Sequence, residues 1–201
     1  MTQDKAIIFL RKDPALAGVI DLVGKYELKK RSGHFAVLVE SIISQQLATS
    51  AADAIFKRFK GLYPKFPTAS EILATRKSKL RAVGLSSMKI EYLKDLARHV
   101  NEGKLNMKTI SKMSDEDVIE HLTQVKGIGR WTAEMFLIFS LGRQDIFPVG
   151  DLALRKGVQM LFSLPEMPKP KEAEKLGQKW KPHRTVATWY LWKSLRQFNK
   201  I

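Results

Sequence analysis

The sequence of 201 residues contains no cysteine. That absence excludes disulfide bonds, thiolate zinc sites, iron–sulfur clusters held by cysteine and a cysteine nucleophile. Long apolar runs are missing as well, since no stretch approaches the roughly 18 apolar residues that a membrane-spanning helix needs. The apolar run near the N-terminus is about five residues long, which is too short for a signal peptide. We therefore expect a soluble intracellular protein.

Acidic residues are few compared with basic ones. The chain has 20 Asp and Glu residues against 35 Lys and Arg residues, which gives a formal net charge of +15 at pH 7. A protein with this charge is expected to bind a polyanion, with nucleic acid as the first expectation and an anionic membrane surface as the second. The basic residues are not gathered on one amphipathic helix, and this disfavours the membrane surface.

β-Strand patterns are also scarce. No convincing run alternates apolar and polar residues, and the one short candidate, Ile146–Val149, contains Pro148. Apolar residues instead recur at spacings of three and four, as on one face of an α-helix. That spacing predicts helices in Phe35–Phe59, Ile90–Val100, Asp115–Leu122, Thr132–Leu141 and Leu152–Leu161. We expect an all-α protein.

A turn rich in glycine stands out among these helices. One helix is expected to end near Gln124 and another to begin near Arg130 or Trp131, with Gly127 and Gly129 on either side of Ile128. Glycine allows a positive φ and lets a second backbone approach closely. The first N–H groups of the following helix point outward with the positive end of its dipole, so the turn can bind a phosphate. The alternative is a plain corner between two helices with Ile128 packed inside.

The segment Val125-Lys-Gly-Ile-Gly-Arg-Trp-Thr-Ala133 resembles the helix–hairpin–helix motif of the base-excision DNA glycosylase superfamily (HhH-GPD). Three further blocks resemble that superfamily and follow in the expected order: Ser41-Ile-Ile-Ser-Gln-Gln-Leu47, Asp145-Ile-Phe-Pro-Val-Gly-Asp-Leu-Ala-Leu-Arg155 and Trp180-Lys-Pro-His-Arg-Thr-Val-Ala-Thr-Trp-Tyr-Leu-Trp192. The blocks are most similar to the DNA-3-methyladenine glycosylase II branch.

The resemblance implies an all-α fold of two helical lobes. One lobe is a helical bundle, residues 34–143, which contains the hairpin. The other lobe combines residues 1–33 with residues 144–201 and carries the catalytic aspartate. The resemblance places the active site in the cleft between the lobes.

Asp151 is the residue to which the resemblance gives the catalytic role. Its position before the apolar segment Leu152–Leu161 also predicts a helix N-cap, in which the carboxylate accepts a backbone N–H. The two roles are compatible, because a capping carboxylate is held rigidly. Cleavage of an N-glycosidic bond builds positive charge on the sugar, and a fixed carboxylate stabilises that charge and orients or activates water. An alkylated purine is already cationic before the bond breaks, so one carboxylate can suffice.

Trp131 occupies the position at which superfamily members that also cut the strand carry a lysine nucleophile. That lysine forms a Schiff base with the sugar. The nearby Lys126 and Lys156 do not match its position. The resemblance thus implies a monofunctional glycosylase that uses water and has no lyase activity.

The resemblance also places residues around an extruded base. Trp131 and Trp192 are the candidate flat walls, and a cation–π contact with a cationic purine contributes about 0.5–2 kcal/mol for each. Gln45 is expected to face the same pocket. Met135 and Leu152 stand where relatives carry aromatic residues, so this pocket is expected to be less aromatic. The alternative for both tryptophans is a place in the core.

DNA contacts are assigned to the hairpin and to one earlier loop. The residues are Gly127, Gly129, Arg130, Thr132 and Gln46. Gln46 takes the position of the side chain that fills the gap left by the flipped base, although a polar helix end with Leu47 in the core is the alternative. Backbone carbonyls of Thr123, Val125 and Gly127 are implied to hold a monovalent cation, Na⁺ or K⁺, that bridges to a DNA phosphate.

The resemblance thus implies a DNA glycosylase that hydrolyses the N-glycosidic bond of alkylated purines, 3-methyladenine and 7-methylguanine, flipped out of duplex DNA. Two alternatives stay open: the same scaffold acting on hypoxanthine, uracil or an oxidised purine, and a non-catalytic hairpin protein that binds DNA or senses damage. The expected partner is duplex DNA with damaged bases, with no membrane partner and no cofactor beyond the cation. We expect a monomer in the cytoplasm and nucleoid of a prokaryote or in the nucleus of a eukaryote.

Overall fold

The computed structural model describes residues 2–198, with side chains described for residues 4–195. Every regular element in this part of the chain is helical, which confirms the expected all-α class. The α-helices are α1 (Thr2–Leu10), α2 (Pro14–Val23), α3 (His34–Ser44), α4 (Thr49–Lys60), α5 (Ala69–Ala74), α6 (Lys77–Ala82), α7 (Ser87–Asn101), α8 (Asp115–Thr123), α9 (Arg130–Phe136), α10 (Leu152–Leu161), α11 (Pro170–Gly177) and α12 (Arg184–Phe198). Shorter helical turns are η1 (Ile110–Lys112), η2 (Leu137–Leu141) and η3 (Gln178–Trp180). Within the described residues, none of the helices has both the length and the apolar character needed to span a lipid bilayer.

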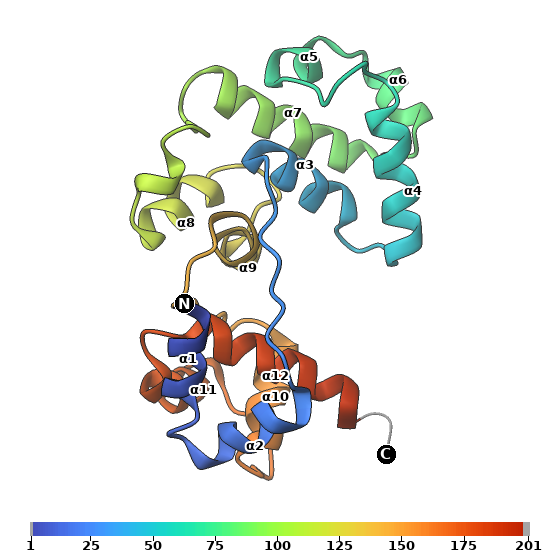
Figure 1. Ribbon diagram of the computed structural model, residues 1–201. Helices are drawn as coiled ribbons and strands as arrows, with labels where there is room; N and C mark the ends of the chain where they lie inside the picture. The colour runs from blue at the N-terminus through green and yellow to red at the C-terminus, as the bar shows by residue number, and fades with distance from the viewer. Residues whose placement is uncertain (1, 199–201) are drawn as a thin grey trace. The chain divides into compact units, whose positions relative to one another are not determined.

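The chain divides into two compact units, drawn in Figure 1. The first unit comprises residues 1–30 and 137–201, and the second unit comprises residues 31–136. The resemblance implies boundaries after residues 33 and 143 instead. Residues 137–143 belong with the first unit because the Phe139 ring stacks on Trp192 and Thr185 Oγ1 donates a hydrogen bond to the Arg143 carbonyl at 2.8 Å.

The first unit is built around α12, which packs against α2 and α10. Its buried apolar core includes Leu16, Ile20, Leu154, Val158, Val186, Tyr190 and Leu191. Burial of side chains of this kind stabilises the fold by about 1.5–3 kcal/mol each. Helices α10 and α12 approach closely at Gly157, where a Cβ atom would lie 2.9 Å from Leu191 Cβ. This close approach holds α10, and Asp151 just before it, against α12.

The second unit is built around α7, which packs against α3, α5 and α6 (Figure 1). Helix α7 begins after Ser86, whose hydroxyl accepts the Lys89 N–H at 3.2 Å. Its buried face contains Ile90, Leu93 and Leu96. Helices α8 and α9 pack on each other, and α9 also contacts α3. The unit therefore carries the glycine turn on the same scaffold as the end of α3.

Two expected helices are interrupted. The segment Phe35–Phe59 forms α3 and α4, which are separated by residues 45–48, and Gln46 there has a positive φ of 56°. The segment Thr132–Leu141 is α-helical only as far as Phe136 and continues as the π-helical turn η2. Both interruptions fall next to residues of functional interest, where tertiary contacts override the apolar periodicity.

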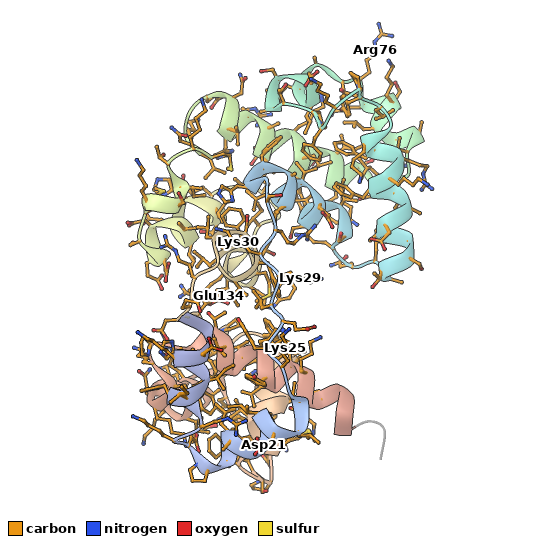
Figure 2. All side chains as sticks on the ribbon, viewed as in Figure 1. Asp21, Lys25, Lys29, Lys30, Arg76 and Glu134 are labelled. Atoms are coloured by element: carbon orange, nitrogen blue, oxygen red, sulfur yellow. The ribbon has the colours of Figure 1, made fainter. Side chains whose placement is uncertain are left out.

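Exposed basic side chains are spread over both units. Lys25, Lys29 and Lys30 lie along the non-helical segment between α2 and α3, and Arg76 projects from the turn between α5 and α6 (Figure 2). Lys25 forms an ion pair with Glu27, with 3.9 Å between Nζ and Oε1. A distribution of this kind suits non-specific attraction of a polyanion more than a single basic helix would.

The packing of α10 on α12 predicts opposite effects for the same substitution at two glycines of the first unit. Gly157→Ala places its methyl group 2.9 Å from Leu191 Cβ, so the free energy of unfolding should fall by about 1–2 kcal/mol. In Gly18→Ala, in α2, the added methyl group meets no atom within 4 Å. The higher helix propensity of alanine should therefore raise the free energy of unfolding by about 0.5–1 kcal/mol. Urea unfolding of both variants measures this, and a stabilised Gly157→Ala would contradict the packing.

Candidate active site

Asp151 caps α10, as its sequence position predicts. Its backbone lies at φ −76° and ψ 121°, and Oδ1 accepts the Leu154 N–H at 2.7 Å. The Asp151 N–H in turn donates to the Pro148 carbonyl at 2.8 Å, which closes the preceding turn. The positive end of the α10 dipole favours the ionised carboxylate at this place. The backbone on both sides therefore fixes the position of the carboxylate.

Trp192 on α12 supplies a second donor to the same oxygen. Its indole Nε1 donates to Asp151 Oδ1 at 2.9 Å, and the residues are 41 positions apart in the chain. The indole ring stacks on Phe139 with 6.0 Å between ring centroids and 12° between planes. A charge-assisted hydrogen bond of this kind restricts the carboxylate and the ring together. Trp192 is half-buried and contacts the carboxylate directly, which the sequence did not predict.

Leu152 follows the carboxylate and is 64% exposed. An exposed large apolar side chain beside a fixed carboxylate makes the start of α10 a mixed surface, apolar next to anionic. Asp151, Trp192 and Leu152 thus lie together in the first unit, at the N-terminus of α10.

The glycine turn connects α8 to α9 at the predicted residues, because α8 ends at Thr123 and α9 begins at Arg130. Gly127 has a φ of +82°, and a Cβ atom there would lie 2.1 Å from the ring of Tyr92. Glycine is required at this position by both the conformation and the packing. Ile128 is buried, which confirms that it packs inside the corner.

Gly129 differs from Gly127. A Cβ atom added at Gly129 would meet nothing within 4 Å, and its φ is not positive. Nothing within the described part of the chain therefore requires glycine there. A glycine with open space beside it exposes backbone to close approach by another molecule, such as a phosphate.

Asp95 holds the turn from α7, and sequence reasoning missed it. The buried carboxylate accepts the Lys126 N–H at Oδ2, at 2.9 Å, and Arg98 Nη1 donates to Oδ1 at 2.9 Å. Lys126 immediately precedes Gly127, so this hydrogen bond fixes the entry to the turn. The one available signal was an aspartate on the apolar face of a predicted helix, where a buried charge needs partners.

Trp131 and its neighbours lie in the first turns of α9. Trp131 is 49% exposed, whereas Thr132 is buried and Met135 is half-buried. The Ala133 N–H donates to the Gly129 carbonyl at 3.1 Å, so the N–H groups of Arg130, Trp131 and Thr132 come before this first turn is closed. The exposed indole is consistent with a flat surface presented to a ligand.

Arg130 joins α8 to α9. Its guanidinium donates to both carboxylate oxygens of Glu116, at 2.8 and 3.2 Å, and to Glu134 Oε1 at 3.2 Å. The hydrogen bond to Glu116 raises the pKa of Arg130, and the same bond lowers the pKa of Glu116. Two carboxylates therefore already contact the Arg130 guanidinium, to which the resemblance assigns a DNA contact.

Gln45 and Gln46 separate α3 from α4. The Gln45 amide Nε2 donates to the Gly127 carbonyl at 2.7 Å, so this side chain reaches the glycine turn. Gln46 is exposed and adopts the left-handed conformation, with φ of 56°. Leu47 is 38% exposed, so the alternative that places it in the core is wrong.

Three carbonyls were predicted to hold a cation. The Val125 carbonyl accepts the Ile128 N–H at 3.0 Å, and the Gly127 carbonyl accepts from Gln45 at 2.7 Å. Each carbonyl oxygen has a second lone pair. Neutral carbonyl oxygens are the ligands that hard cations prefer, so Thr123, Val125 and Gly127 are chemically suited to the predicted cation.

Comparisons with known proteins identify a family for this chain. The model of the HhH-GPD superfamily of base excision DNA repair proteins matches residues 39–183. DNA-3-methyladenine glycosylase 1 of Schizosaccharomyces pombe is 41% identical over 182 residues, which span 88% of this chain and 80% of that protein.

Two solved structures are similar over most of their length. The 3-methyladenine DNA glycosylase Mag1 of S. pombe, in complex with abasic DNA, has a TM-score of 0.85 at 40% identity and covers 96% of this chain and 97% of its own. The DNA-3-methyladenine glycosidase of Bacillus halodurans has a TM-score of 0.88 at 37% identity and covers 96% and 89% of the two chains.

The two glycines of the turn predict a matched pair of variants. Gly127→Ala forces a side chain into a positive φ and against the Tyr92 ring, and it should lower the free energy of unfolding by about 2–4 kcal/mol. Gly129→Ala has open space and should change it by less than about 0.5 kcal/mol. Thermal or urea unfolding distinguishes them, and equal losses would show that the turn is packed differently.

Proposed function

Because the chain belongs to the HhH-GPD superfamily of base excision DNA repair proteins, we propose that it is a DNA glycosylase that releases alkylated purines, 3-methyladenine and 7-methylguanine, from duplex DNA. One observation carries the proposal. Asp151 stands in the superfamily's signature block, and its carboxylate is held at one oxygen by the Leu154 N–H and the Trp192 indole N–H. A carboxylate fixed in this way can stabilise charge that develops on a sugar.

The reaction is a hydrolysis. The bond between the base nitrogen and C1′ breaks, and its electron pair neutralises the cationic purine, which leaves as a neutral base. Positive charge develops on the sugar and is stabilised by Asp151. Water then bonds to C1′ and loses one proton to the carboxylate or to solvent. The products are a free base and an abasic strand.

The departing base needs no acid of its own. Methylation at N3 of adenine or N7 of guanine gives the base a positive charge, and departure of the base removes it. A single carboxylate is then sufficient, whereas most glycoside hydrolases use two. Gly150, which precedes Asp151, offers no second carboxylate.

The flipped base is recognised by aromatic faces. The Trp192 indole donates to Asp151 through Nε1 and stacks on Phe139 with one face. In this proposal the purine stacks on the other face of the indole. Trp131 supplies a second, half-exposed indole. Cation–π contact favours a cationic purine by about 0.5–2 kcal/mol for each indole, which selects alkylated purines only modestly. The resemblance also assigns Met135 and Leu152 to the base, and both are apolar.

Strand cleavage is not part of this activity. The lysine that would form a Schiff base is replaced by Trp131, so no amine lies at that position to attack C1′. The abasic strand should therefore stay intact until another agent cuts it.

The glycine turn binds the DNA backbone in this proposal. Backbone N–H groups of Gly127, Gly129 and Thr132 approach a phosphate, and the open space at Gly129 permits that approach. Arg130 contributes to DNA binding by holding the geometry of the turn, because its guanidinium is already paired with the carboxylates of Glu116 and Glu134. Gln46, exposed on its left-handed turn, fills the gap that the flipped base leaves.

A monovalent cation would be held by the carbonyls of Thr123, Val125 and Gly127. When bound, Na⁺ or K⁺ would supply positive charge beside a DNA phosphate. The Gly127 carbonyl accepts one hydrogen bond from Gln45 and keeps a second lone pair.

Because the proposed substrate is damaged DNA, we infer that the protein acts at the chromosome, in the nucleoid of a prokaryote or the nucleus of a eukaryote. We propose that it acts there as a monomer on duplex DNA.

The experiment uses duplex DNA methylated with dimethyl sulfate, which contains both 7-methylguanine and 3-methyladenine. Free bases are measured by chromatography, and strand breaks are scored with and without hot alkali. We expect both bases to be released and breaks to require alkali. Asp151→Asn should slow release by about 10²–10⁴-fold, because the charge that stabilises the sugar is lost.

Glu166→Gln is the matched control, since it removes the same charge from an exposed residue of the first unit. It should stay within twofold of the unmodified protein. Breaks without alkali would contradict the argument from Trp131. Tight binding of methylated DNA with no base release would indicate another lesion or a non-catalytic DNA-binding protein.

A further inference from the structure

The side chain of Gln45 connects two segments that are 82 residues apart. Its amide Nε2 donates to the Gly127 carbonyl at 2.7 Å, and both residues belong to the second unit. A carbonyl oxygen only accepts hydrogen bonds, so the amide nitrogen must face it. The amide group therefore has a fixed orientation and a specific partner within the protein.

The partner of Gln45 is itself anchored on α7. The Tyr92 ring covers Gly127, and the Asp95 carboxylate accepts the N–H of the preceding Lys126 at 2.9 Å. Helix α7 also holds the end of α3, because Lys89 Nζ donates to the Ile43 carbonyl at 2.7 Å. The turn is thus a rigid point to which the Gln45 side chain is tied.

Gln46 directly follows this tie. Its left-handed backbone, with φ of 56°, is unfavourable for any residue other than glycine and persists only where neighbouring contacts hold it. On one side the Gln45 amide is bound to Gly127, and on the other the Leu47 N–H donates to the Ser44 carbonyl at 3.3 Å. These contacts fix the backbone at Gln46 and thereby the direction in which its side chain leaves the backbone.

We propose that Gln45 is a positioning residue that fixes the inserting side chain of Gln46 relative to the phosphate-binding turn. The proposal rests on the function given above, in which Gln46 fills the stack and the turn binds the backbone. It replaces the expectation that Gln45 faces the base. In physical terms, the hydrogen bond from Gln45 to Gly127 fixes the distance between the turn that binds the phosphate and the side chain that fills the gap in the base stack.

This role differs from base recognition in a measurable way. A side chain that contacts the flipped base affects 3-methyladenine and 7-methylguanine differently, because the edges of the two purines differ. A side chain that only positions Gln46 affects both by the same factor. A positioning role also disappears once Gln46 itself is truncated.

The test measures single-turnover release of both bases from the same methylated duplex, with protein in excess. Gln45→Met keeps the length of the side chain and removes the donor. It should slow release of both bases by the same factor, about three- to tenfold, which corresponds to the loss of one neutral hydrogen bond. Binding to undamaged duplex DNA should stay within twofold, because the turn remains held by Asp95 and Tyr92.

Gln46→Ala and the double variant complete a cycle. Gln46→Ala should slow release, and adding Gln45→Met should slow it no further. Ser44→Ala is the matched control, since its hydroxyl donates to the Glu40 carbonyl at 2.8 Å at the same end of α3 without reaching the turn. It should release both bases at the unmodified rate.

Four results would overturn the proposal. They are a Gln45→Met variant as fast as the unmodified protein, a factor that differs more than threefold between the bases, a Gln46→Ala variant with no effect, and fully additive losses in the double variant. Any of these leaves the proposed function standing if the unmodified protein releases base. Failure of the unmodified protein to release either base would overturn the function and this proposal with it.

Discussion

The hydrogen bonds that meet on one oxygen of Asp151 are the constraint on which the proposed chemistry depends. The Leu154 N–H comes from the start of α10 and the indole N–H comes from α12, so the carboxylate is aimed by two helices at once. Those helices can approach closely because Gly157 has no side chain. A single fixed carboxylate suits a cationic leaving base, whose departure removes charge from the base and places it on the sugar.

The second unit has a different role, which is to hold the backbone of the glycine turn rigidly at a surface. Helix α7 does this in two ways: the Tyr92 ring packs on Gly127, and the Asp95 carboxylate accepts the Lys126 N–H. The two glycines of the turn then have separate tasks. At Gly127 the Tyr92 ring occupies the space that a side chain would take, whereas the space beside Gly129 is open to another molecule.

Much of this was predictable from local chemistry. The end of α8, the start of α9, the burial of Ile128 and the capping role of Asp151 follow from spacing, glycine and N-cap preference, all of which act within a few residues. The bond from Trp192 to Asp151 and the bond from Gln45 to Gly127 were not predictable, because they join residues far apart in the chain. The break between α3 and α4 was likewise invisible to apolar periodicity, since a left-handed Gln46 needs tertiary support.

The rate of base release by Trp192→Phe examines the fixed carboxylate itself. This variant keeps an aromatic face and removes only the indole donor to Asp151. Hydrogen bonds to charged groups contribute about 1.5–3 kcal/mol, so single-turnover release from methylated duplex DNA should slow by about 10- to 100-fold. Trp131→Phe makes the same chemical change in the second unit and should cost less than tenfold. Release by Trp192→Phe at the unmodified rate would contradict the claim that a carboxylate held from two helices performs the hydrolysis.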